Sequence, residues 1–318
     1  MKVDWISSIE DKCFEDEKFL TFTKNLKEKY NLIEDIEEIR NPEKIFFESE
    51  KINKLAVISE NENFIALVKI YKDLDWSGKR QLSFEVMTIL DKEFSKIYKI
   101  LDIIIDEKSI ENVQNTIITF NDEFSDYAQQ KNTIIQGNGN HYTLSKSDID
   151  IEKLMSWVKE ISSNNSDLRI EFFHGIPEEY IEPYCTLFME TSEDMPDNKE
   201  SGFVPYVITP DLQRKNHVSY GQFHYCYMIF NEKNELIAKS NVRIKEDYPY
   251  QFMIGVKREY RGRKLGKWLH GSMYSKVYKE KDFKKIHIVH HPLNKAAINL
   301  SLSVGYKFIF NEKKYIFV

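Results

Sequence analysis

An imperfect internal repeat is the feature that most constrains the fold of this 318-residue chain. Residues 62–104 and 234–272 each read as a strand containing Ile-Ala, a polar turn, a second strand, a charged step ending in Glu and an aromatic residue, and a stretch of helical period. Each copy also ends in a strand-like aromatic run, at 140–145 and at 313–318. We therefore expect a duplicated α/β domain. The alternative is chance similarity between two strand-turn-helix stretches.

Length and composition agree with two domains. The chain is longer than one core usually supports, and 42% hydrophobic residues allow a large interior. The polar stretch 162–168 carries turn residues and marks the boundary, so we expect domains at 1–150 and 165–318.

The charge and the cysteines exclude several classes of protein. A formal net charge of −6 argues against broad binding to nucleic-acid phosphates. Cys13, Cys185 and Cys226 show no C-x-x-C spacing, so neither a disulfide framework nor a zinc knuckle is indicated. No apolar run approaches about 18 residues, which predicts no membrane segment. We expect a cytoplasmic protein.

The two copies differ most in a basic stretch of the second. Residues 258–267 carry five cationic side chains and two glycines where a strand gives way to a helix, whereas the matching residues 95–100 contain no glycine. The first N–H groups of a helix lack internal partners and bind anions, and glycine lets an anion approach the backbone. Gly262 and Gly266 are therefore expected to form an anion cradle. The cations expected around a bound diphosphate are Arg261, Arg263, Lys264 and Lys267.

A solvent-exposed basic turn is the alternative for this stretch. The helix dipole disfavours it, because the first turn of a helix prefers Asp and Glu. The spacing matches neither a dinucleotide fingerprint nor a Walker loop.

Two motifs carry a resemblance to a known family. VKREYRGRKLG (256–266), followed by NKAAINLSLSVGY (294–306), resembles the coenzyme A loop and the next helix of the GNAT N-acetyltransferase superfamily. The family patterns are Arg/Gln-x-x-Gly-x-Gly/Ala and Asn-x-x-Ala-Ile-x-Leu-Tyr-x-x-x-Gly-Phe. The likeness covers about 170–318, including Met195-Pro196, and its layout is similar to bacterial tandem-GNAT proteins related to mycothiol synthase. The second motif matches at Asn294, Ala297, Ile298, Leu300 and Gly305, with Tyr306 in the Phe position.

The resemblance implies a fold and a co-substrate. It implies two tandem GNAT-like domains, each a mixed, mostly antiparallel sheet flanked by helices, with the N-terminal copy degenerate. Acetyl-CoA is the implied co-substrate, and two splayed strands hold it. Backbone near Ile254 would meet the acetyl carbonyl, and Val256 would pair with the pantetheine arm. The expected coenzyme-binding residues are Ile254, Gly255, Val256, Arg261, Gly262, Arg263, Lys264, Leu265, Gly266, Lys267 and Asn294.

Three positions in this segment leave questions open. Gly255 would ease the approach of the acetyl group or would only form a bulge. Lys264 replaces the middle glycine of the loop, which is tolerable if it keeps ordinary helical dihedrals. Asn294 would pack against the cofactor wall or cap local backbone.

The catalytic groups are less well determined. Ser301 stands where many family members have the tyrosine that protonates the leaving thiolate, so the usual general acid is missing. His290, at the end of a strand, and Glu190, on the expected acceptor side with Glu193 and Asp194, are the other candidates. A structural histidine and an acidic helix end are the respective alternatives. No metal site is expected, because strand alternation sends His287 and His290 to opposite faces.

Three functions follow from these observations. The first is acetyl transfer from acetyl-CoA to the primary amine of a small molecule, with only the C-terminal half catalytic. The second is a non-catalytic acyl-CoA sensor or metabolite-binding module. The third is nucleic-acid binding through residues 257–267, which the overall acidity disfavours. We expect no nucleic-acid or membrane partner, and a monomer rather than a homodimer.

Overall fold

Two compact units make up the protein, one of residues 1–139 and 309–318 and a second of residues 140–308. The computed structural model describes residues 1–6, 16–30, 52–74, 80–90, 94–108, 113–120, 123–194, 208–220, 224–245 and 248–317. Cys13, Glu93 and Met195-Pro196 lie outside these residues. No helix in the described ranges is long and apolar enough to cross a bilayer.

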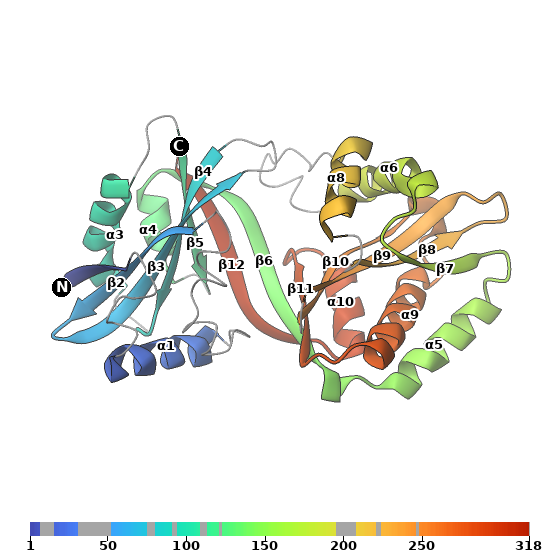
Figure 1. The fold of residues 1–318 in the computed structure, drawn as a ribbon, viewed down its shortest axis with the longest axis horizontal. Coiled ribbons are helices and arrows are strands. Elements are labelled where there is room, and N and C mark those ends of the chain that lie inside the picture. Colours follow the sequence, from blue (N-terminus) through green and yellow to red (C-terminus); the bar gives the residue numbers. More distant parts are fainter. Residues whose placement is uncertain are drawn as a thin grey trace. The chain divides into compact units, whose positions relative to one another are not determined.

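Unit 1 is a mixed sheet with helices on both faces (Figure 1). Its strands are antiparallel neighbours except for the parallel pair β4–β5. Buried residues of α3 and α4, such as Ile97 and Tyr127, pack on one face, and Phe19 and Phe22 of α1 pack on the other. The elements are β1 (Lys2–Ile6), α1 (Glu17–Tyr30), β2 (Ile52–Glu60), β3 (Asn63–Leu74), β4 (Arg80–Thr88), α3 (Ser95–Lys108), β5 (Gln114–Phe120), α4 (Ser125–Gln130), the start of β6 (Thr133–Ser145) and most of β12 (Lys307–Phe317).

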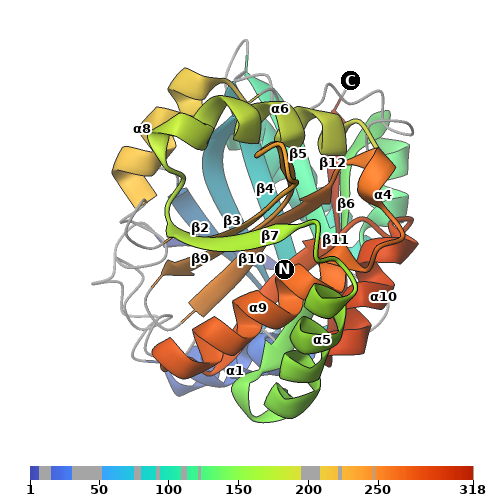
Figure 2. The ribbon, with the colours of Figure 1, turned by 90° about the vertical axis from the view of Figure 1, so that its right-hand side faces the viewer.

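Unit 2 repeats this plan with its own set of strands, β7 to β11 and the end of β6. Helices α5 and α9 lie side by side on one face, as Figure 2 shows, and α6 covers the other face. The apolar side chains of α9 are buried along one face, from Leu265 through Met273 to Val277. The elements are α5 (Ile151–Ser163), β7 (Arg169–His174), α6 (Ile181–Ser192), α8 (Pro210–Tyr220), β8 (His224–Phe230), β9 (Leu236–Lys245), β10 (Tyr248–Val256), α9 (Leu265–Glu280), β11 (Lys285–His290) and α10 (Lys295–Val304), with short 3₁₀ turns η3 (Lys146–Asp148), η4 (Glu178–Tyr180) and η6 (Arg258–Tyr260).

The internal repeat is visible in the fold. Ile65-Ala66 lies in β3 and Ile237-Ala238 in β9; each strand is followed by a hairpin partner, β4 or β10, and then by a helix, α3 or α9. The mixed, mostly antiparallel sheets are those that the resemblance implies.

The final strand of each copy completes the sheet of the other copy. Residues 140–145 of β6 pair with β11 of unit 2, and residues 312–316 of β12 pair with β5 of unit 1. The compact units therefore divide the chain at 139/140 and 308/309, and the C-terminal strand belongs to unit 1 instead of the second domain. Aromatic and β-branched composition predicts that these runs are strands, but it does not select the neighbour with which they pair.

Candidate functional site

Strands β10 and β11 part soon after they meet. Along the described residues of both strands, they pair in parallel at one register position, Tyr250 with His287. Beyond it, β10 stays paired with β9 as far as Val256, and β11 stays paired with β6 as far as His290. The facing edges of β10 and β11 are thus open beyond Tyr250 and His287, which is the splay that the resemblance implies.

Residues 257–264 connect β10 to α9 through a tight turn. Gly262 has φ +85°, which glycine adopts without strain, and an added Cβ would meet nothing within 4 Å. Lys264, the residue before α9, has φ 59° and ψ 19°. Lys264 therefore does not keep the ordinary helical dihedrals under which a lysine would replace the glycine without cost. The chain needs a left-handed residue to enter the helix at this point, which explains why the family pattern has a glycine here.

The start of α9 leaves backbone amides for an anion. The amides of Lys267 and Trp268 both donate to the carbonyl of Lys264, at 3.0 and 3.2 Å. No side chain caps the N-terminus of α9. The N–H groups of Leu265 and Gly266 are therefore the ones available to a ligand within the described part of the chain.

A cavity of about 340 Å³ lies against this helix start. A Cβ added at Gly266 would come within 3.1 Å of Leu300 Cδ2, so glycine keeps this wall compact. We call the lining residues the cradle: Val256, Tyr260, Arg261, Gly262, Lys264, Leu265 and Gly266. Six of them were expected to bind coenzyme, while Ile254, Gly255, Arg263, Lys267 and Asn294 lie outside the lining.

Four cations of the connection are paired with carboxylates of the same unit. Arg258 and Arg261 both contact Asp194, each at 2.6 Å. Arg263 contacts Asp167 and Asn165, and Lys264 contacts Glu160 at 2.9 Å. Hydrogen bonds from these cations hold the pKa values of Asp194, Asp167 and Glu160 below their usual range. Lys267 Nζ lies 4.7 Å from the centre of the Trp157 ring. We call Arg258, Arg261, Arg263 and Lys264 the struts of the turn, because each is held by one of these carboxylates.

Gly255 is where α6 approaches the sheet. A Cβ at Gly255 would lie 2.8 Å from Thr191 Oγ1, so only glycine allows this helix to sit so close. The bulge in β10 lies between Gln251 and Met253. Of the two roles left open for Gly255, close approach fits, but the approaching group is α6 of this chain. The neighbouring Ile254 packs toward α9.

His290 and Ser301 are brought together. His290 Nε2 lies 2.7 Å from Ser301 Oγ, and both side chains are buried. Burial lowers the pKa of His290 to about 4, so the imidazole is neutral at pH 7. Asn294 begins α10 and accepts a hydrogen bond from the amide of Ala297 at 3.2 Å, which is the capping role considered for it.

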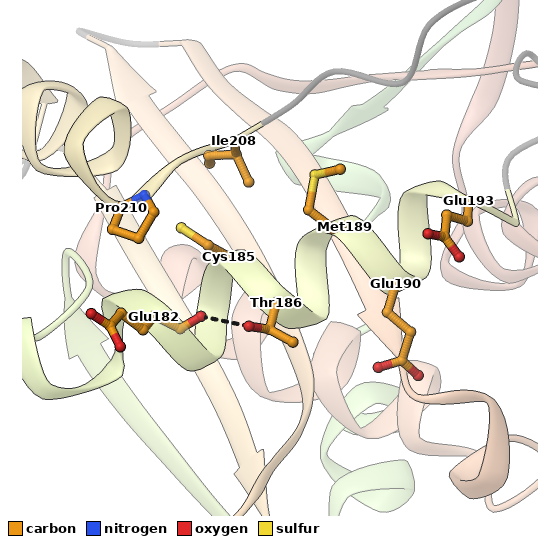
Figure 3. A pocket seen from close by; sticks show the side chains of 8 residues that line it. All are labelled: Glu182, Cys185, Thr186, Met189, Glu190, Glu193, Ile208 and Pro210. Carbon is orange, nitrogen blue, oxygen red and sulfur yellow. Dashed lines mark hydrogen bonds between the residues drawn. The ribbon is translucent and has the colours of Figure 1, made fainter.

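Glu190 lines a second, larger cavity on α6. This cavity of about 640 Å³ is partly acidic and partly apolar, and Glu190 and Glu193 project from the C-terminal half of the helix (Figure 3). Asp194 does not line it, since its carboxylate is turned to the two arginines. The other lining residues are Glu182, Cys185, Thr186, Met189, Ile208 and Pro210.

A buried lysine was not anticipated from the sequence. Lys239 is fully buried in β9 opposite Gly255, and its Nζ has no hydrogen-bond partner among the described residues. It lies 4.2 and 4.8 Å from the ring centres of Tyr184 and Phe188 on α6. Burial lowers its pKa to about 7. A lysine directly after the apolar run Leu236-Ile237-Ala238 was the available signal.

Comparison with known proteins gives a family match for part of the chain. Residues 186–306 match the model of the Acetyltransferase (GNAT) family. No curated protein sequence matches the chain.

Solved structures resemble the chain along nearly its whole length. A GCN5-related N-acetyltransferase from Sphaerobacter thermophilus has a TM-score of 0.62 at 8% identity, covering 99% of this chain and 95% of that one. A tandem GNAT protein from the clavulanic acid biosynthesis pathway has a TM-score of 0.56 at 11% identity, covering 99% and 98%. At these identities the likeness concerns the fold, which is that of tandem GNAT proteins.

Proposed function

We propose that the protein, whose residues 186–306 match the GNAT family within a tandem GNAT fold, is an acetyl-CoA-dependent N-acetyltransferase acting on the primary amine of a small molecule. The observation that carries the proposal is the cradle, where a cavity of about 340 Å³ meets the uncapped N-terminus of α9. Such a helix end favours a phosphate group through its backbone amides and dipole.

The cradle and the open strand edge fit the parts of the co-substrate. Acetyl-CoA supplies an acetyl group activated as a thioester. The amides of Leu265 and Gly266 would hold its diphosphate, and the edge of β10 near Val256 and Ile254 would take the pantetheine arm and the acetyl carbonyl. The ion pairs with Asp194 and Glu160 keep Arg261 and Lys264 at the cavity wall, where their positive charge still favours an anion.

The buried histidine–serine pair supports a route for the proton. Acyl transfer forms a C–N bond and breaks a C–S bond, so the proton that the amine nitrogen loses is the one that the sulfur needs. The neutral imidazole of His290 can accept and donate at the same time, and its Nε2 is 2.7 Å from Ser301 Oγ. We assign this pair to proton relay in place of the absent tyrosine.

Glu190 is the proposed carboxylate on the acceptor side. It lies on α6 together with Glu193, on the wall of the 640 Å³ cavity, where it can attract a cationic amine. Its neighbour Thr191 contacts Gly255 of β10, so α6 links this cavity to the strand that would hold the acetyl group.

Thiol release from acetyl-CoA tests the proposal. Polyamines, aminoglycosides and amino acids form the first panel of acceptors. Release that depends on one of these amines would support acetyl transfer. Tight coenzyme A binding with no release for any of them would reject the enzyme and leave a non-catalytic acyl-CoA-binding module.

Ser301→Ala tests the relay. We expect kcat to fall about 100-fold with little change in KM for acetyl-CoA, because proton transfer by a positioned group contributes about this much. Ser303→Ala on the same helix is the matched control, since its hydroxyl donates to the carbonyl of Leu300 and faces no imidazole. Equal activity of the two variants would reject a role for Ser301 in catalysis.

A further inference from the structure

We propose that Asp194 is a positioning residue for the cradle, acting through Arg258 and Arg261. The inference rests on the proposed function, because it assigns a role in binding coenzyme A. Asp194 directly follows Glu193, the C-cap residue of α6, and belongs to none of the expected coenzyme-binding positions.

One carboxylate holds both ends of the turn that precedes Gly262. Arg258 Nη2 donates to Asp194 Oδ1, and Arg261 Nη2 donates to Asp194 Oδ2, each at 2.6 Å. Arg258 begins η6 and Arg261 follows it, so the whole 3₁₀ turn lies between the two contacts.

Arg261 is fixed a second time, to the strand. Its Nε donates to the carbonyl of Val256, the last residue of β10, at 3.1 Å. Both Val256 and Arg261 line the cradle. The guanidinium therefore joins the end of β10, the turn and the end of α6, and the shape of the cavity depends on all three.

The two contacts form a network on a half-sheltered carboxylate. The side chain of Asp194 is 25% exposed, whereas that of Arg258 is 70% exposed. An isolated pair at such a surface would contribute little, but two guanidinium groups on one carboxylate restrain each other. The network therefore reduces the conformational entropy that the turn 258–261 loses when a diphosphate binds.

Asp194 also carries a negative charge near an anion site, which opposes binding. Two guanidinium groups in direct contact offset this charge, so the three groups together are positively charged. Repulsion of the ligand therefore weakens binding less than loss of the turn would, and the net effect of removing Asp194 is weaker binding.

Asp194→Ala tests the inference by calorimetric titration with coenzyme A. We expect the Kd of coenzyme A to rise about 10-fold. The KM for acetyl-CoA should rise by the same factor while kcat stays within about twofold, because the relay at His290 and Ser301 is untouched. The Kd of Asp194→Asn should lie between those of the wild type and Asp194→Ala, since the amide oxygen of asparagine accepts from only one arginine. A purely structural role would lower the thermal midpoint without this split between KM and kcat.

Asp148→Ala is the matched control. Asp148 pairs with Lys307 at 2.7 Å in the same unit and does not line the cradle, so its loss should leave the Kd unchanged. If Asp194→Ala fails to fold, Arg258→Gln removes the more exposed half of the network and should raise the Kd about threefold.

The outcomes separate this inference from the proposed function. Failure of the wild-type protein to bind coenzyme A would reject the function itself. Binding by the wild type with an unchanged or lower Kd for the Asp194 variants would reject only the positioning role, and a lower Kd would identify Asp194 as a repelling charge.

Discussion

The same position in the two units holds opposite chemistry. In unit 1, Leu67 of β3 is paired with Met87 of β4, and both pack against α1. In unit 2, the repeat places Lys239 of β9 opposite Gly255 of β10, beneath α6. Unit 1 thus has an ordinary apolar core where unit 2 has a buried amine and a missing side chain.

The parallel strand pair next to this position is also regular in unit 1 and interrupted in unit 2. In unit 1, β4 and β5 pair at five positions, from Gln81–Gln114 to Glu85–Ile118, whereas β10 and β11 pair at one. The sequence before α3, residues 89–94, contains no glycine, while residues 257–264 lead into α9 through Gly262 and a left-handed Lys264. Unit 1 has the same order of strands and helix, but β4 and β5 stay paired where β10 and β11 part, and no glycine directly precedes its helix. The strained backbone of Lys264 and the buried amine of Lys239 thus both occur in the unit where a ligand is expected.

The largest expected effect comes from filling the cradle. Gly266→Glu would place a carboxylate at the second residue of α9, where the diphosphate is expected. Coenzyme A affinity should fall at least about 100-fold, which corresponds to about 3 kcal/mol. Calorimetric titration measures the affinity, and circular dichroism checks the fold.

Lys96→Glu is the matching change in unit 1, because Lys96 is the second residue of α3. Its affinity for coenzyme A should equal that of the wild type. A folded Gly266→Glu variant that keeps its affinity would contradict the assignment of the cradle, as would a loss of affinity in Lys96→Glu.

The next effect concerns the buried amine. Lys239→Leu copies Leu67 of unit 1 and removes an uncompensated polar group. The folded-state pKa of Lys239 is about 7 and the ordinary value is 10.5, so the unfolded state binds more protons between these pH values. The stability of the wild type therefore decreases as the pH falls from about 10.5 to about 7. The variant should be more stable by about 2 kcal/mol at pH 7, since the Tyr184 and Phe188 rings offset part of the cost of burial.

Urea unfolding at pH 7 and pH 10 measures this difference. The gain in free energy of unfolding should shrink toward zero at the higher pH. Leu67→Lys provides the reverse change in unit 1 and should destabilise the protein at pH 7. A gain from Lys239→Leu that does not depend on pH would show that the pKa of Lys239 is not lowered in the folded protein.

The smallest effect concerns the left-handed residue. Lys264→Gly should raise the free energy of unfolding of unit 2 by about 1 kcal/mol, because glycine adopts φ 59° without steric cost. The exposed ion pair with Glu160 that is lost contributes little. Lys264→Ala keeps the Cβ at positive φ and should give no gain. Thermal unfolding measures the stability of both variants, and an equal stability of Lys264→Gly and Lys264→Ala would contradict the account.

Much of the fold could be predicted from the sequence, because it depends on local periodicity. The repeated Ile-Ala strands, the hairpins and the buried stripe of α9 follow from residue patterns a few positions long. The exchange of the last strands could not be predicted, because β6 and β12 would pair equally well by composition with either sheet.

The candidate site likewise has one part that the sequence predicts and another that it does not. The glycines Gly262 and Gly266 are a local signal in the sequence, and both line the cavity at the start of α9. The strut partners lie far away in sequence, since Asp194 precedes Arg258 by 64 residues and Glu160 precedes Lys264 by 104. The left-handed conformation of Lys264 was missed because a lysine carries no sign of positive φ.

A crystal structure with coenzyme A tests the central claim most directly. The account predicts the diphosphate at the amides of Leu265 and Gly266, inside the cavity bounded by Gly262, with nothing bound at the start of α3. A diphosphate bound in unit 1, or a cradle left empty while coenzyme A binds elsewhere, would contradict it.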